Sequence, residues 1–217
     1  MPVIRLVLIR HGQSLATTQG IAGGQRGCRG LSELGRRQVQ ALAQRLETTG
    51  EAAGADVLLS STLPRAVETA EGISAALGGL AVQQDRGLCE MDPGEGDGLT
   101  WSEWEARYGT FDLGAEPYRP LAPGGESWAG FGLRVGETLS RIVAGHPNAT
   151  VVACCHGGVI EHAFMHALGL VGEAPGRRLS TAPNASLNEW HVDEGIDGQR
   201  WRLMRFGDAA HVSRLSE

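Results

Sequence analysis

The sequence predicts an α/β fold in which helices cover both faces of a mainly parallel β-sheet. Nearly continuous apolar, β-branched runs, typical of strands buried on both faces, occur at residues 3–9, 57–60 and 150–155. A segment with helical periodicity follows each run, and this alternation is typical of a three-layer α/β/α sandwich. With 217 residues and 41% hydrophobic side chains, the chain can bury one large core, so we expect a single domain over residues 1–217.

Capping residues set the limits of the expected helices. Ser32 is a candidate N-cap for the first helix and Gly50 its stop, while Pro64 suits the first turn of the second. Thr100 and Glu103 form a capping-box pattern that begins the third. The expected helices cover residues 32–50, 62–77, from 100 onward, 127–143 and 159–168.

The remaining strands are shorter or lie in the tail. Residues 81–84 form a short strand candidate after the second helix. Residues 185–192 and 199–206 are separated by an Asp197-Gly198 turn signal, which predicts a terminal antiparallel hairpin.

Residues 88–126 are expected to form a small cap insertion over the site. Their first part is rich in glycine and acid, and residues 108–125 hold several prolines and glycines, so neither favours a sheet element. Apolar side chains in the second part still need burial, which favours a packed excursion over a flexible linker; these are Phe111, Leu113, Tyr118 and Leu121.

The charge pattern excludes several classes of partner. The net charge is -6 and no segment concentrates basic residues, so nucleic acid and membrane surfaces are not expected partners. All nineteen basic residues are arginine, because the sequence has no lysine. Lysine Schiff-base chemistry and a Walker-type phosphate loop are therefore excluded, and any phosphate must be held by arginine, histidine and backbone N–H groups.

The N-terminus and the cysteines favour a cytoplasmic location. The first ten residues include arginine within the apolar stretch and have no signal-peptide pattern, and no transmembrane span is visible. Cys28, Cys89, Cys154 and Cys155 have neither zinc-ligand nor C-x-x-C spacing. No metal and no cofactor is expected.

Four candidate ligands of an anion follow or lie near the ends of predicted strands. Arg10 and His11 follow the first strand, Arg65 follows the second, and His156 follows residues 150–155. Ligands of α/β sheets gather at the carboxyl ends of the strands, so we expect these side chains to meet. Neighbouring glycines, including Gly157, leave backbone N–H groups open to an anion at a helix N-terminus.

This set of residues suits phosphoryl transfer. Arg10, Arg65 and His156 would hold the phosphoryl oxygens, and neutral His11 would attack phosphorus through one ring nitrogen. The leaving alkoxide needs a proton, for which Glu90 is the candidate and Asp92, Glu95 and Asp97 are rivals.

Five motifs in order resemble the histidine phosphatase superfamily, also called phosphoglycerate-mutase-like. They are LIRHGQS at 8–14, SSTLPRAVETA at 60–70, LCEMDPGEGDGLT at 88–100, PGGES at 123–127 and CHGGVI at 155–160. The resemblance implies a phosphohistidine intermediate on His11, phosphate ligands at Arg10, Arg65 and His156, and Glu90 as the proton donor. It also implies no metal requirement, a cap insertion and a second copy of the chain as a candidate partner.

The expected activity is phosphomonoester hydrolysis on a small phosphorylated metabolite. The alternative is a 2,3-bisphosphoglycerate-dependent phosphoglycerate mutase, but similar mutases carry an asparagine where this chain has Thr17, a different loop at residues 21–30 and a lysine-containing basic cap. Fructose-2,6-bisphosphate hydrolysis is a further candidate within the same chemistry. A non-catalytic phosphate-binding protein is the alternative from another class.

Other polar and aromatic residues have weaker assignments. Gln13 and Ser14 could touch phosphate or stabilise the loop. Glu126 and Ser127 are expected to start a helix, and the pair His162 and His166 to be structural because no third metal ligand is evident. Core packing is expected for Trp101, Trp104 and Tyr108, which can also wall the pocket. Arg26 and Arg29 could attract a second anionic group, although surface arginines without such a role are commoner.

Overall fold

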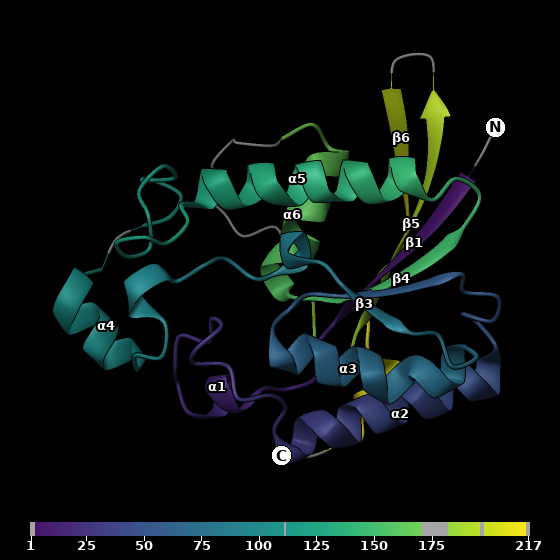
Figure 1. Cartoon of the computed structure of the whole chain (residues 1–217), viewed down its shortest axis with the longest axis horizontal. Coiled ribbons are helices and arrows are strands. Elements are labelled where there is room, and N and C mark those ends of the chain that lie inside the picture. Colours follow the sequence, from purple (N-terminus) through teal and green to yellow (C-terminus); the bar gives the residue numbers. More distant parts are fainter. Residues whose placement is uncertain (1–2, 111, 171–181, 196–197, 216–217) are drawn as a thin grey trace.

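The computed structural model describes residues 3–110, 112–170, 182–195 and 198–215 (Figure 1). Six strands form one mixed sheet in the order β3-β2-β4-β1-β5-β6. Neighbours from β3 to β1 pair in parallel, and the last two strands pair antiparallel. The strands are β1 (Val3–Arg10), β2 (Val57–Ser60), β3 (Val82–Gln84), β4 (Thr150–Cys155), β5 (Leu187–Gly195) and β6 (Gly198–Asp208).

Helices cover both faces of this sheet, as the sequence predicts. Helices α2 (Glu33–Thr49) and α3 (Pro64–Ser74) lie on one face, and α5 (Trp128–Gly145) and α6 (Gly157–Ala167) lie on the other (Figure 1). Each face has its own cluster of buried apolar side chains, with the central strands contributing alternate residues to the two clusters. Thus Leu6 and Leu8 pack under α5 and α6, while Val7 and Ile9 pack under α2 and α3.

The register of the parallel strands brings three chain segments together at one edge. Arg10 at the end of β1 lies opposite Cys155 of β4, and Ser60 at the end of β2 lies opposite Cys154. The residues that immediately follow these strands, His11, Ser61 and His156, are therefore neighbours. This convergence follows from the pairing alone, because parallel strands end at the same side of a sheet.

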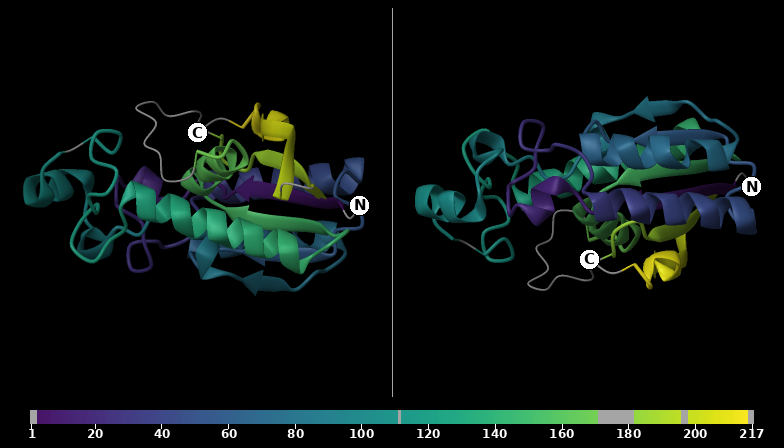
Figure 2. Two further views of the ribbon diagram at one scale, coloured as in Figure 1. Left: turned by 90° about the horizontal axis from the view of Figure 1, so that it is seen from above. Right: turned by 90° about the horizontal axis from the view of Figure 1, so that it is seen from below.

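Residues between β3 and α5 extend beyond that edge. They include two 3₁₀ turns (Arg86–Leu88 and Gly94–Gly96) and helix α4 (Trp101–Tyr108), which begins at a capping box of Thr100 and Glu103. Figure 2 shows α4 and its flanking loops lying apart from the sheet, past the end where β1 finishes. Trp104 is buried and Tyr108 half-buried, whereas Tyr118 is 76% exposed, contrary to the expectation that it would be covered.

Several boundaries differ from the sequence-based expectation. A short helix, α1 (Leu15–Thr18), capped by Ser14, was not predicted because four residues carry too little periodicity. The α-helix predicted to reach Leu77 ends at Ser74 and continues as a 3₁₀ turn. The strand predicted from Ala185 begins at Leu187, because Ala185 adopts φ 56° and donates its N–H to the carbonyl of Arg10.

Other expectations were confirmed. Ser32 and Ser127 cap α2 and α5, and Gly50 ends α2 in the left-handed conformation with φ 64°. The tail forms the predicted antiparallel hairpin, although the Asp197 half of its turn lies outside the described residues. Within the described ranges, no helix is both long and apolar enough to cross a membrane.

Candidate active site

His11 lies directly after β1, where its two ring nitrogens have different neighbours. Nδ1 is 2.6 Å from the carbonyl oxygen of Gly12, and Nε2 is 3.1 Å from Nε of Arg65. A carbonyl can only accept, so Nδ1 carries the proton and Nε2 presents its lone pair. Gly12 is required here, because a Cβ would lie 2.5 Å from the carbonyl oxygen of Gly35.

Arg65, in the first turn of α3, links the two histidines. Its Nε lies 3.1 Å from His11 Nε2 and 3.2 Å from His156 Nδ1, and its Nη1 donates to the carbonyl of Gly23 at 2.6 Å. The imidazole centroids are 5.0 Å apart. The glycine-rich loop therefore fixes the guanidinium between the two rings.

Both histidines are electrically neutral near neutral pH. Burial and the Arg65 guanidinium hold the pKa of His11 and of His156 well below the ordinary value of 6.5. In His156, Nδ1 accepts from Arg65, so Nε2 carries the proton and donates to Ser61 Oγ at 2.7 Å. His156 can donate Nδ1–H to a phosphoryl oxygen only if it gains a proton, which a nearby dianion favours.

Arg10 offers a second guanidinium to an anion. Its Nη1 donates to the carbonyl of Ala182, and its Nε is buried with no hydrogen-bond partner in the described part of the chain. Burial is the main cause that lowers the pKa of this group. Gly157 lies against this guanidinium, because a Cβ added to Gly157 would lie 3.6 Å from Cζ and Nε of Arg10.

These groups open into a cavity of about 480 Å³. Arg10, His11, Ser14, Arg65 and Gly157 all line it. His156 is fully buried behind Arg65 and contributes through hydrogen bonds.

Gln13 is not part of this lining. Its side-chain oxygen instead accepts from Ser32 Oγ at 2.7 Å, next to the start of α2. This contact favours the loop-stabilising role that the sequence left open.

Glu90 is the carboxylate of the acid-rich loop that reaches the His11 cavity. Its Oε2 accepts from the N–H of Gly158, at the start of α6, and its Oε1 from Met91, both at 3.1 Å. Glycine at position 158 leaves room for this carboxylate, because a Cβ there would lie 2.3 Å from Glu90 Oε1 and 2.7 Å from the Phe131 ring.

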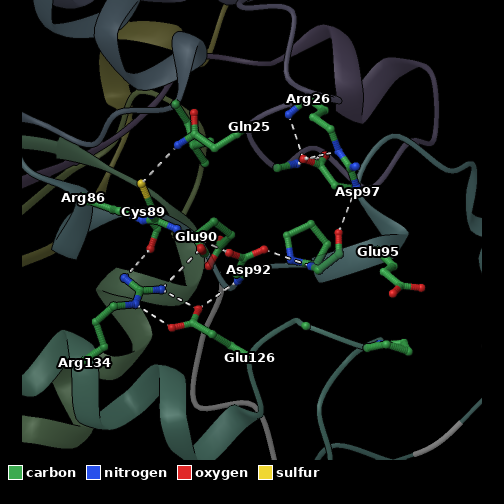
Figure 3. A pocket seen from close by; sticks show the side chains of 16 residues that line it. Gln25, Arg26, Arg86, Cys89, Glu90, Asp92, Glu95, Asp97, Glu126 and Arg134 are labelled. Carbon is green, nitrogen blue, oxygen red and sulfur yellow. Dashed lines mark hydrogen bonds and ion pairs between the residues drawn. The ribbon is translucent and has the colours of Figure 1, made fainter.

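The rival acids lie around an adjoining cavity of about 650 Å³, which Glu90 also lines (Figure 3). Asp97 accepts from three backbone N–H groups of residues 24–27, and Asp92 accepts from Gly94. Glu95 lines this second cavity and is exposed. Glu126 pairs with Arg134 at 2.6 Å, while Arg26 pairs with Asp97.

Some residues at the site had no assignment from the sequence. Glu161, buried on α6, lines the His11 cavity, and Ser61 orients His156. Both positions could have been predicted from the sequence, since Ser61 follows a predicted strand and Glu161 comes five residues after His156. His162 packs between Trp128 and Phe131, with ring centroids at 4.3 and 4.7 Å, and His166 lies near Ser140 and Trp201.

Comparisons with known proteins agree with this geometry. Residues 6–209 match the model of the histidine phosphatase superfamily (branch 1), so the chain belongs to that superfamily. The chain therefore has the fold of a histidine-phosphatase-type enzyme.

Individual relatives include both phosphatases and a mutase. A metal-independent phosphoserine phosphatase from Arabidopsis thaliana is 28% identical over 98% of this chain and 85% of its own length. A 2,3-bisphosphoglycerate-dependent phosphoglycerate mutase from Methylobacterium radiotolerans is 32% identical over 76% and 79%. The solved structure of a mycobacterial glucosyl-3-phosphoglycerate phosphatase superimposes with a TM-score of 0.77 at 30% identity, covering 94% of this chain and 99% of that one.

Proposed function

We propose that this protein is a phosphomonoesterase that hydrolyses a small phosphorylated metabolite through a phospho-His11 intermediate. The observation that carries the proposal is the fixed tautomer of His11, whose Nε2 lone pair faces the Arg65 guanidinium in a cavity. A histidine that is neutral, oriented and placed beside two arginines is equipped to attack phosphorus.

The reaction has two displacements at phosphorus. In the first, Nε2 of His11 forms a bond to phosphorus, the ester P–O bond breaks, and Glu90 gives its proton to the leaving alkoxide. In the second, Glu90 takes a proton from water, the water oxygen bonds to phosphorus, and the P–N bond breaks to release phosphate. Arg10, Arg65 and protonated His156 neutralise the phosphoryl oxygens during both displacements.

Residues 88–126 are proposed to act as the cap over this reaction. Their Glu90, Met91, Leu113 and Leu121 line the His11 cavity. Ser14 and Gly157 are proposed to contact the substrate, since both line the same space. Neither a metal nor a cofactor has a step in this mechanism, and a cytoplasmic location and a homodimer remain predictions.

Phosphoglycerate mutase chemistry is the alternative. It is supported by one relative with that name, but this chain lacks lysine and has Thr17 and a divergent loop at residues 21–30. Hydrolysis is supported by relatives that are named phosphatases, among them the Arabidopsis thaliana and mycobacterial proteins described above. Fructose-2,6-bisphosphate remains a candidate substrate, and a non-catalytic phosphate-binding protein would keep the pocket without turnover.

Trapping the intermediate tests the proposal. Protein mixed with a ³²P-labelled monoester and quenched in alkali should retain acid-labile label, and His11→Ala should lose both label and turnover. Phosphate release should greatly exceed isomerisation of 3-phosphoglycerate primed with 2,3-bisphosphoglycerate. Efficient isomerisation with negligible phosphate release would instead establish the mutase, and undiminished turnover by His11→Ala would refute the mechanism.

A further inference from the structure

Ser61 is a fully buried serine whose hydroxyl has two hydrogen-bond partners. Its Oγ lies 2.7 Å from Nε2 of His156 and accepts from the N–H of Leu63 at 3.2 Å. The backbone of Ser61 is fixed as well, because its N–H donates to the carbonyl of Cys154 in β4 at 3.0 Å. The pairing of β2 with β4 therefore determines where this hydroxyl lies relative to His156.

The free protein holds His156 in the tautomer that cannot donate to a phosphoryl oxygen. The Nε–H of Arg65 faces both Nδ1 of His156 and Nε2 of His11, at 3.2 and 3.1 Å. Nδ1 of His156 is therefore an acceptor, and the ring proton lies on Nε2, where the hydroxyl of Ser61 accepts it.

Binding of a phosphoryl group reverses what Nδ1 of His156 must do. When the guanidinium of Arg65 binds a phosphoryl oxygen instead, Nδ1 loses its donor and its lone pair faces an oxygen lone pair. Nδ1 must then take up a proton, which water supplies, before it can hydrogen-bond to the phosphoryl group. The ring becomes an imidazolium, in which both nitrogens donate.

The surroundings of His156 oppose this imidazolium. Burial and the nearby cations lower the pKa of the ring in the free protein. Among the described residues, the charged and titratable groups around the ring come from several elements: Arg10 and His11 from the end of β1, Arg65 from α3, Arg134 from α5 and Glu90 from the acid-bearing loop. A bound phosphoryl dianion offsets part of the cost, and an acceptor at Nε2 offsets more of it.

We propose that Ser61 is a positioning residue for phosphoryl transfer, which holds the ring of His156 at Nε2 and favours the imidazolium that donates Nδ1–H to the phosphoryl group. A hydrogen bond from a charged donor is roughly twice as strong as one from a neutral donor, so the hydroxyl stabilises the imidazolium more than the neutral ring. The second bond, to the N-cap Leu63, ties the same hydroxyl to the first turn of α3, which carries Arg65. This inference rests on the proposed phosphatase function and adds a residue to its phosphoryl site.

NMR of the wild-type protein with ¹⁵N-labelled histidine tests the protonation states directly, with His156→Gln used to assign the signals. In the free protein at pH 7, His156 should be neutral with its proton on Nε2. In the complex with inorganic phosphate, both ring nitrogens should carry protons. A proton on Nδ1 in the free protein, or a neutral His156 in the complex, would overturn the inference.

Ser61→Ala removes the acceptor. A larger fraction of His156 should be neutral in its phosphate complex, and the Kd of inorganic phosphate should rise by about three- to tenfold. The kcat/KM for ethyl phosphate and for p-nitrophenyl phosphate should fall by a similar factor, about ten- to a hundredfold, because the phosphoryl group is common to both. Ser61→Thr keeps a hydroxyl and should restore most of these quantities.

Ser60→Ala is the matched control. Ser60 is also fully buried, and its hydroxyl donates to the carbonyl of Ser61 at 2.9 Å rather than to a histidine. The protonation of His156 in its phosphate complex should match the wild type. Unchanged protonation in Ser61→Ala, or an equal change in Ser60→Ala, would overturn the inference and leave the phosphatase function intact. Failure of the wild type to hydrolyse any monoester would overturn the proposed function, whatever the NMR result.

Discussion

Two contacts at His11 determine which ring nitrogen can act as the nucleophile. The Gly12 carbonyl binds the Nδ1 proton, and Arg65 turns its Nε–H toward Nε2. The Arg65 contact also disfavours protonation of Nε2, since a positive charge already lies beside it. The same guanidinium that would hold the phosphoryl group thus keeps the nucleophile neutral before substrate arrives.

The pH profile should reflect this environment. A histidine with an ordinary pKa would be protonated, and lost as a nucleophile, as the pH falls through about 6.5. Because burial and Arg65 hold the pKa of His11 well below that value, kcat/KM should not decrease between pH 7 and pH 6. The measurement requires correction for ionisation of the ester itself. An acid limb with an apparent pKa near 6.5 would contradict the assignment.

Glu90→Gln should reveal proton donation through its dependence on the leaving group. The kcat/KM for ethyl phosphate should fall by about 10²-fold or more, because an alkoxide needs a proton to leave. The loss for p-nitrophenyl phosphate should be at least about tenfold smaller, because p-nitrophenolate leaves unprotonated. Glu95→Gln, an exposed acid of the same loop outside the His11 cavity, is the control and should resemble the wild type. Equal losses on both esters would exclude Glu90 as the acid.

At the scale of elements, α5 fixes the loop that carries Glu90. Arg134 on this helix donates to the carbonyls of Gly87 and Cys89 at 2.8 and 3.1 Å, and forms two hydrogen bonds with Glu126 (Figure 3). Burial opposes ionisation of Glu126, yet its bonds to Arg134 and Asp92 hold its pKa below the ordinary value. The Arg134 side chain thus links the beginning of the segment 87–126 to its end.

Arg134→Met should therefore act on Glu90 through the loop. We expect a loss of about 1–3 kcal/mol of unfolding free energy, because partly buried carbonyls and Glu126 lose their donors. The kcat/KM for ethyl phosphate should fall more than that for p-nitrophenyl phosphate, in the same sense as Glu90→Gln. Arg141→Met removes an exposed arginine of the same helix, paired with Asp85, and should change neither quantity appreciably. If Arg134→Met lowered the unfolding free energy but reduced kcat/KM for ethyl phosphate and for p-nitrophenyl phosphate by the same factor, Arg134 would have a structural role only.

The order of elements was largely predictable, because it depends on local patterns. Buried strands and capped helices left clear signals, and the ends of β1 and β4 marked Arg10, His11 and His156. Short-range patterns could not predict α1, or the left-handed Ala185, whose conformation is stabilised by bonds to the carbonyls of residues 10 and 11. These features depend on segments far apart in sequence.

At the scale of the whole molecule, the site exists because segments distant in sequence end at one edge of the sheet. Composition and spacing could place candidates there but could not distinguish Glu90 from its rivals, since all lie within one loop. The structure distinguishes them, because Glu90 accepts from the N–H of Gly158 beside the His11 cavity, whereas Asp97 accepts from the backbone of residues 24–27. Trp101 and Trp104 line the cavity, as the sequence allowed, whereas Trp128 and Phe131 could not be placed there because they lie on α5, far from His11 in sequence.

The aromatic packing around this cavity also makes the stability of the whole fold depend on pH. His162 lies between Trp128 and Phe131, and its Nε2 is buried without a partner among the described residues. Burial lowers its pKa to about 4, with Arg134 adding to the effect. Below pH 6.5 the unfolded chain therefore takes up a proton at this position that the folded chain takes up only near pH 4.

The stability contributed by neutral His162 is complete above pH 6.5 and is lost as the pH falls toward 4. His162→Phe keeps an aromatic ring in the slot and cannot titrate, so its unfolding free energy should fall less steeply over this interval. The difference in slope between wild type and variant should approach about 1.4 kcal/mol per pH unit. Urea unfolding at pH 7.5 gives the packing baseline, because His162 is neutral in both states there. If the unfolding free energies of wild type and variant instead fell in parallel from pH 6.5 to 4, His162 would take up its proton over the same pH range in the folded and unfolded protein. Burial between Trp128 and Phe131 would then not be a cause of the pH dependence of stability.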